Sequence, residues 1–146
     1  MPEESASFHR LMPLTAAQLE AASDPQAYRQ AVRYAQSAHV VDRLRIGAAL
    51  SARFHGTRGI YTTRIDVSGR AFQFECTCPL GGKREACKHV IALGLAWLDT
   101  PDTFHDLDVT LARLSHMTKG DLITLLRQAA QRLPELIALL DRPRRE

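Results

Sequence analysis

Residues 76–89 read CTCPLGGKREACKH, in which a Cys-x-Cys pair, a loop and a Cys-x-His pair follow one another. Side chains two residues apart in a strand point to the same side, so Cys76 and Cys78 can reach one ion from the end of a strand. Side chains two residues apart on a helix diverge by about 200°. Cys87 and His89 can therefore converge only if Cys87 precedes a helix and His89 lies in its first turn.

The donor set of this segment predicts a metal site. Three thiols and one imidazole at this density match the tetrahedral shell of structural zinc. The predicted ligands are Cys76, Cys78, Cys87 and His89. Because four protein ligands leave no position for water, we expect one structural Zn²⁺ rather than a catalytic ion. Lys83, Arg84 and Lys88 either offset the charge of the three thiolates or contact a partner.

The residues on either side of the loop predict a sheet and a buried helix. Alternation of apolar and other side chains predicts strands at 43–54, 60–67 and 71–78. Short turns between them, such as the one at 68–69, predict a three-stranded antiparallel meander. Residues 89–98 are apolar nearly all round, so the helix that they predict must be buried against the meander.

Helices are expected on both sides of this segment. Thr15 with Gln18 forms a capping-box start for a short helix. Asp24 followed by Pro25 starts a second helix, whose apolar stripe we expect to pack on the sheet. Residues 107–140 show three further helical patterns, the second capped by Thr118 and the third started by Pro134, which predict a helical arm.

These elements together predict an α+β protein in three parts. A three-stranded antiparallel meander with a zinc-bound strand-strand-helix unit forms the centre, flanked by N-terminal helices and a C-terminal helical arm. The expected boundaries are 1–23 for an N-terminal extension and short helix, 24–100 for the zinc-finger domain and 101–146 for the C-terminal helical region.

Length and composition limit the class of protein. A chain of 146 residues has room for one compact domain with an arm, but not for an ATPase engine as well. The apolar run at 90–98 is about half of what a membrane crossing needs, and residues 1–7 show no export signal. Three clustered cysteines are a poor disulfide framework. We therefore expect a cytoplasmic protein.

The sequence contains no catalytic constellation. It has no Gly-Lys-Thr phosphate loop, no Gly-x-Ser-x-Gly elbow and no dinucleotide fingerprint. The remaining histidines lack a nucleophile or a paired carboxylate at a suitable spacing: His9, His39, His55, His105 and His116. We therefore expect no enzyme, no catalytic residue and no small-molecule substrate.

The spacing of the ligands and its surroundings resemble the SWIM zinc finger, whose signature is Cys-x-Cys, a variable loop and Cys-x-His in a strand-strand-helix frame. The likeness to bacterial members extends over roughly residues 28–100, including the His55-Gly56 turn, Tyr61 and the helix at 87–98. It implies a zinc-stabilised module associated with DNA binding and protein contacts, often attached to helicase-like ATPases, transposases or ubiquitin ligases. The 146 residues include no such motor, so we expect an accessory role beside a partner.

The distribution of charge favours a polyanionic partner. Residues 42–89 hold nine Lys or Arg against four Asp or Glu, in a chain of net charge +3. A basic zone around a metal loop favours nucleic acid, DNA more than RNA, bound mainly through its phosphates. The candidate contacts are Arg53, Arg58, Arg64, Arg70, Lys83, Arg84 and Lys88.

A protein adaptor is the alternative function. The apolar side chains between Leu107 and Leu140 would then dock on a partner protein or on a second copy of the chain, for example within a helicase-like or recombination complex. Packing of these residues within the chain itself is the simpler explanation for them. The sequence leaves the oligomeric state open.

Overall fold

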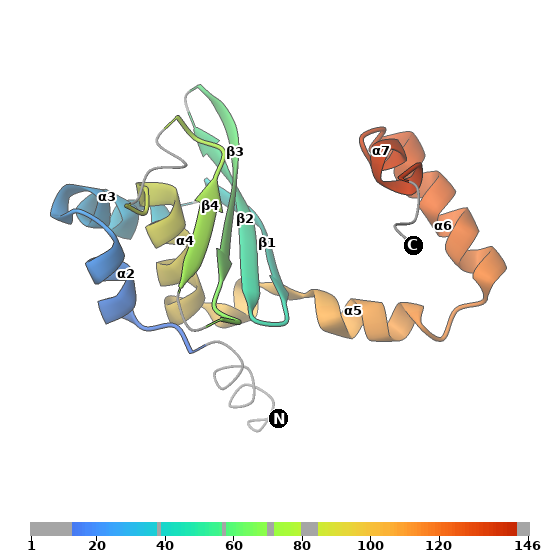
Figure 1. Cartoon of the computed structure of the whole chain (residues 1–146), viewed down its shortest axis with the longest axis horizontal. Coiled ribbons are helices and arrows are strands. Elements are labelled where there is room, and N and C mark those ends of the chain that lie inside the picture. Colours follow the sequence, from blue (N-terminus) through green and yellow to red (C-terminus); the bar gives the residue numbers. More distant parts are fainter. Residues whose placement is uncertain (1–12, 38, 57, 70–71, 80–84, 143–146) are drawn as a thin grey trace. The chain divides into compact units, whose positions relative to one another are not determined.

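A computed structural model gives the chain an α+β architecture and describes residues 13–142 apart from 38, 57, 70–71 and 80–84 (Figure 1). In chain order the elements are α2 (Ala16–Ala22), α3 (Pro25–Ala35), β1 (Val40–Ile46), β2 (Ala49–Gly56), β3 (Gly59–Asp66), β4 (Gln73–Cys76), α4 (Lys88–Asp99), the 3₁₀ helix η1 (Pro101–Thr103), β5 (His105–Asp106), α5 (Leu107–Leu114), α6 (Lys119–Arg132) and α7 (Leu136–Leu140). Two compact units form: unit 1, Met1–Asp108, and unit 2, Val109–Glu146. The expected division into three functional parts stays a prediction.

Helices α2 and α3 begin where the sequence predicts them. The Thr15 hydroxyl accepts a hydrogen bond from the Gln18 backbone N–H at 3.2 Å, and the Gln18 side chain accepts one from the Thr15 N–H at 2.9 Å. The Asp24 carboxylate accepts from the N–H groups of Gln26 and Ala27, each at 2.9 Å. These caps satisfy donors that a helix N-terminus leaves unpaired, so both start signals are confirmed.

The sheet has five strands in the order β4-β3-β2-β1-β5, so it is larger than the predicted three-stranded meander. Strands β1 to β4 pair antiparallel in chain order, whereas the two-residue strand β5 pairs parallel to β1. The sheet is therefore mixed. The prediction has one strand where the structure has β1 and β2. It also misses β5, which is too short to show an alternating pattern.

The stretch 43–54, which the alternation predicts as one strand, is divided between β1 and β2. Gly47 lies in the turn between them with φ of +54°, in the left-handed region that glycine enters without steric cost. Leu44 pairs with Ser51 and Arg45 pairs with Leu50. The alternating apolar residues on the two sides of the turn therefore point to opposite faces of the sheet, and the sequence pattern hides the reversal.

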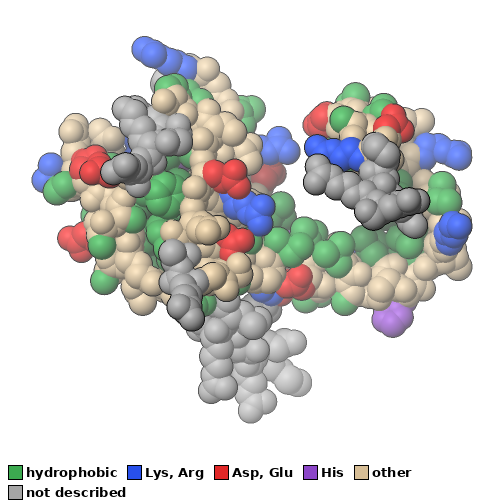
Figure 2. All heavy atoms as spheres, in the orientation of Figure 1, with side chains coloured by type: hydrophobic (Ala, Val, Ile, Leu, Met, Phe, Trp, Pro, Cys, Tyr) green, Lys and Arg blue, Asp and Glu red, His purple; other side chains and the backbone are tan. Residues whose placement is uncertain are grey.

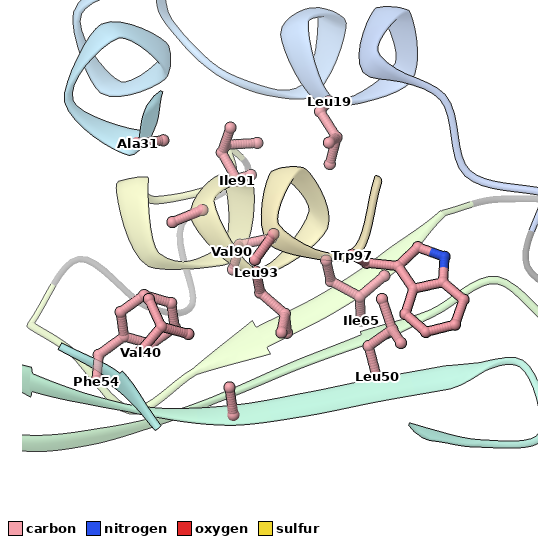
Figure 3. Close-up of a cluster of buried hydrophobic side chains, with 14 of the residues drawn as sticks. Leu19, Ala31, Val40, Leu50, Phe54, Ile65, Val90, Ile91, Leu93 and Trp97 are labelled. Atoms are coloured by element: carbon pink, nitrogen blue, oxygen red, sulfur yellow. The ribbon is translucent and has the colours of Figure 1, made fainter. Parts of the chain in front are cut away.

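Helix α4 lies between the sheet and the helices α2 and α3, and this position buries nearly all of it, as predicted (Figure 3). Ile91 and Leu93 have no exposed surface, and Trp97 is 2% exposed. The sheet contributes Leu50 and Ile65 to the same core. The predicted packing of α3 on the sheet is wrong: α3 packs on α4, which already occupies that face of the sheet.

Strand β5 is tied to β1 by a buried ion pair. The Arg45 side chain is 4% exposed, and its Nη2 lies 2.6 Å from Asp106 Oδ2. Its Nη1 donates to the Gly47 carbonyl at 2.9 Å and lies 3.5 Å from Asp108 Oδ2. Removing one partner of such a pair typically costs about 3–5 kcal/mol, because the other charge stays buried. This network therefore fixes the C-terminal end of unit 1 to the sheet.

The helices of unit 2 leave their apolar residues exposed, and α7 begins two residues after the predicted start at Pro134. The Thr118 hydroxyl caps α6 by accepting a hydrogen bond from the Asp121 N–H at 3.1 Å. No described residue of unit 2 is buried. Figure 2 shows apolar side chains at the surface along α5. Large apolar residues of the unit are 40–63% exposed: Val109, Leu111, Ile123, Leu125, Leu126, Leu133, Ile137, Leu139 and Leu140.

None of the helices within the described ranges is long and apolar enough to cross a membrane.

Candidate metal centre

The four predicted ligands lie where strand β4 ends and helix α4 begins. Strand β4 ends at Cys76, and Cys78 follows two residues later. Cys87 is the N-cap of α4, and His89 is the second residue of that helix. The predicted arrangement, with Cys87 before the helix and His89 in its first turn, is therefore confirmed.

The distances between the ligand atoms fit a single metal ion. One ligand atom from each of the four residues lies within 4.8 Å of the others. His89 Nδ1 lies 3.8 Å from Cys76 Sγ and 3.9 Å from Cys87 Sγ. Ligand atoms around a tetrahedral ion with metal–sulfur bonds of about 2.3 Å are roughly 3.8 Å apart. These four residues, called here the Cys/His cluster, can therefore hold one metal ion.

The ligands of the cluster differ in exposure. Cys78, Cys87 and His89 are 6%, 7% and 4% exposed, whereas Cys76 is half-buried at the end of the edge strand. Three ligands are therefore shielded by the core. Cys76 is therefore the most exposed residue of the cluster.

Aromatic rings from three elements surround the imidazole of His89. The ring centres of Phe54, Tyr61 and Tyr34 lie 5.1, 5.2 and 5.8 Å from the centre of the His89 ring. Gly56 makes room for one of them, because a Cβ at that position would lie 2.9 Å from Tyr61 Cε2. These contacts from α3, β2 and β3 restrict the orientation in which the imidazole presents its Nδ1.

Cys76 has polar partners that favour its ionised form. The hydrogen bond with Cys87, aided by those with His89 and Thr63, lowers the pKa of Cys76 from 9.0 to about 3 against the opposing effect of burial. The same contact with Cys76, together with burial, raises the pKa of Cys87. The two opposite shifts mean that Cys76 and Cys87 together hold one proton near neutral pH when no metal is bound.

Two of the predicted nucleic-acid contacts, Arg53 and Arg64, lie on the face of the sheet opposite α4. Their side chains are 53% and 51% exposed. Each has an acidic neighbour: Arg53 Nε lies 3.4 Å from Asp42 Oδ2, and Arg64 Nη2 lies 3.6 Å from Asp66 Oδ2. Alternation along β2 and β3 places both arginines away from the buried side, so they share one surface.

The other predicted contacts do not join this surface. Lys88 begins α4, on the opposite side of the sheet, and its Nζ lies 4.9 Å from the centre of the Tyr34 ring. Arg58 is exposed in the turn between β2 and β3. Three further predicted contacts lie outside the described residues: Arg70, Lys83 and Arg84. The described cations therefore do not form one continuous face around the Cys/His cluster.

The sequence analysis did not identify the residues that support the ligands. Thr63 lies directly opposite Cys76 on the neighbouring strand, with its Oγ1 3.1 Å from Cys76 Sγ. Its position between Tyr61 and Ile65 in an alternating strand places it on the buried face. A hydroxyl there needs a hydrogen-bond partner, and this requirement is the signal that could have identified Thr63.

No protein-family model, curated protein or solved structure matches the chain at a significant level. The geometry of the Cys/His cluster and the distribution of exposed side chains are therefore the grounds for assigning a function.

Proposed function

We propose that the chain is a zinc-stabilised binding module without catalytic activity. The Cys/His cluster carries this proposal, because its four ligand atoms lie within 4.8 Å of one another at the junction of β4 and α4. Three thiolates and an imidazole are the donor set of structural zinc, and they fill a tetrahedral shell. A filled shell has no position for a reactive water, so the ion would stabilise the fold around it.

We further propose that the module is a SWIM-type zinc finger. The order of the ligands supports this, with Cys-x-Cys at the end of β4 and Cys-x-His at the start of α4. The strands β3 and β4 and the helix α4 supply the strand-strand-helix frame that the resemblance implies. Strand β5 and the helices of unit 2 lie outside the motif, and the resemblance does not account for them.

Nucleic acid, DNA in particular, is the partner that we propose for this module. The excess of nine basic over four acidic side chains in residues 42–89 supports it. Arg53 and Arg64 share the face of the sheet opposite α4 and are more than half exposed. Exposed ion pairs typically contribute about 0–1 kcal/mol, so Asp42 and Asp66 leave both guanidinium groups able to contact phosphates.

Fluorescence anisotropy tests this partner. Zinc content is first measured, and the zinc-loaded protein is then titrated into labelled single- and double-stranded DNA and RNA at several salt concentrations. We expect salt-sensitive binding with little sequence selectivity, because binding to phosphates releases counterions. The double variant Arg53→Gln/Arg64→Gln should weaken binding and lower the salt slope by about one for each arginine replaced.

A matched control removes the same charge from the other side of unit 1. Arg29 and Arg33 are exposed on α3, so Arg29→Gln/Arg33→Gln changes the net charge equally without altering the proposed surface. Equal losses of affinity in the two double variants would show that binding depends on net charge alone. No binding at micromolar protein and low salt would contradict the nucleic-acid proposal and leave the zinc module in place.

A second candidate function is a protein adaptor that docks through unit 2, such as an accessory subunit of a helicase-like or recombination complex. The observation in its favour is that no described residue of unit 2 is buried, although nine of its large apolar side chains are at least 40% exposed. Helices of this length are marginal in water without tertiary packing. A partner protein that covers these side chains would stabilise α5, α6 and α7.

A further inference from the structure

Thr63 is a buried polar residue whose hydroxyl faces a metal ligand. It lies in β3 with no exposed surface, paired directly with Cys76 of β4. Its Oγ1 lies 3.1 Å from Cys76 Sγ, and within the described part of the chain this is the hydroxyl's hydrogen-bond partner. A buried hydroxyl left unpaired costs roughly 1–3 kcal/mol, so this contact is needed on the Thr63 side as well.

The register that brings these atoms together is held at the next pair of residues. The Thr62 N–H donates to the Thr77 hydroxyl at 2.9 Å, and the Thr77 N–H donates to the Thr62 carbonyl at 3.1 Å. These bonds extend the pairing of β3 with the chain beyond the end of β4. Arg64 pairs with Glu75 on the other side, so the register of Cys76 opposite Thr63 is held in both directions along the strand.

The direction of the hydrogen bond follows from the chemistry of a metal ligand. Cysteine binds zinc as the thiolate, which has no proton to donate. The Thr63 hydroxyl must therefore be the donor whenever the cluster holds an ion. The bond withdraws electron density from a sulfur that is only half-buried, whereas Cys78 and Cys87 are shielded by the core.

We propose that Thr63 is a positioning residue of the metal centre: its hydroxyl orients the Cys76 thiolate toward the ion and protects it from electrophiles. This inference depends on the proposed metal site and adds a residue outside the ligand set. Outer-shell hydrogen-bond partners typically change metal affinity by about 10–100-fold when removed. The bond therefore sets both the affinity of the cluster and the reactivity of its most exposed cysteine.

The test compares four full-length proteins: wild type, Thr63→Val, Thr63→Ser and Thr62→Val. Valine at 63 keeps the shape but removes the hydroxyl, and serine keeps the hydroxyl. Thr62 is exposed on the other face of the same strand, so Thr62→Val controls for the same chemical change nearby. Zinc affinity is measured by chelator competition. Alkylation of Cys76 by iodoacetamide, with loss of iodide, is followed by mass spectrometry on the zinc-loaded protein.

We expect Thr63→Val to lower zinc affinity by about tenfold or more and to speed alkylation of Cys76, with Thr63→Ser and Thr62→Val close to wild type. The melting temperature of the metal-free variants is measured alongside, so that a loss of the fold is distinguished from a loss of zinc affinity. Wild-type affinity and alkylation in Thr63→Val would overturn the inference, as would equal losses of affinity in Thr63→Val and Thr63→Ser. A wild-type protein that binds no zinc would instead overturn the proposed function itself.

Discussion

Cys76 and Cys87 share a proton that an incoming metal ion has to displace. Contact with Cys76 and burial raise the pKa of the Cys87 thiol, whereas the pKa of Cys76 is lowered to about 3, chiefly by its hydrogen bond with Cys87. The metal binds the thiolate and not the thiol. Metal uptake and proton loss from this pair of cysteines are therefore coupled.

We expect each zinc ion that binds at neutral pH to release at least about one proton, and we expect zinc affinity to fall as the pH is lowered. Zinc affinity falls at lower pH because protons compete with the ion for the thiolates. Titration calorimetry in two buffers of different ionisation enthalpy measures the number released. The variant Cys87→Ser should bind zinc more weakly and release fewer protons. Tight binding without proton release would contradict the shared proton assigned to Cys76 and Cys87.

At the scale of elements, the packing of α2 on α4 depends on a glycine. Gly94 lies in the middle of α4, where alanine would ordinarily favour the helix by about 0.5–1 kcal/mol. A Cβ at this position would lie 2.6 Å from Leu19 Cδ2 and 2.7 Å from Leu19 Cδ1. Leu19 has no exposed surface, so its side chain has no free space into which to move.

We therefore expect Gly94→Ala to destabilise the protein by about 1–3 kcal/mol, the typical cost of overpacking a core. Chemical denaturation measures this free energy. Gly120 of α6 offers a matched control: the nearest atom to its added Cβ is 4.0 Å away, so Gly120→Ala should not reduce stability. A stabilised Gly94→Ala variant would show that α2 moves away from α4 at little cost.

At the scale of the whole molecule, the two units use their apolar residues in different ways. The buried hydrophobic residues of the described chain all belong to unit 1, where α4 collects them between the sheet and the helices α2 and α3. The Arg45–Asp106 ion pair also lies within unit 1. Unit 2 contributes no described residue to a core, so the stability of unit 1 should not depend on it.

A chain shortened to end at Asp108 should therefore keep its zinc content and its fold. We expect its melting temperature to change by less than the roughly 4–8 °C that 1 kcal/mol corresponds to in a domain of this size. Calorimetry and metal analysis measure both properties.

The same shortened chain separates the two candidate functions. Nucleic-acid binding through Arg53 and Arg64 should survive the truncation, whereas docking of a partner through unit 2 should be abolished. A large drop in melting temperature would contradict the independence of unit 1. It would mean that unit 2 contributes to the stability of the fold of unit 1.

The local features of the chain could be predicted from spacing alone. Each of these features depends on residues within about one helical turn of one another. They are the helix starts at Thr15, Asp24 and Thr118 and the placement of Cys87 and His89. Such short-range patterns restrict how the backbone N–H groups at a helix start can be paired. They also restrict the local conformations in which Cys87 and His89 can reach one ion. The sequence by itself therefore determined the ligand set, the caps and the buried character of α4.

The tertiary structure alone decided how these parts meet. The turn at Gly47, the parallel pairing of β5 and the contact between Thr63 and Cys76 all depend on strand register, which an alternating pattern does not specify. The same register places Arg53 and Arg64 on a face that Lys88 does not share. These outcomes depend on how strands and helices pack together. That packing involves the whole core and outweighs the conformational preference of any single segment.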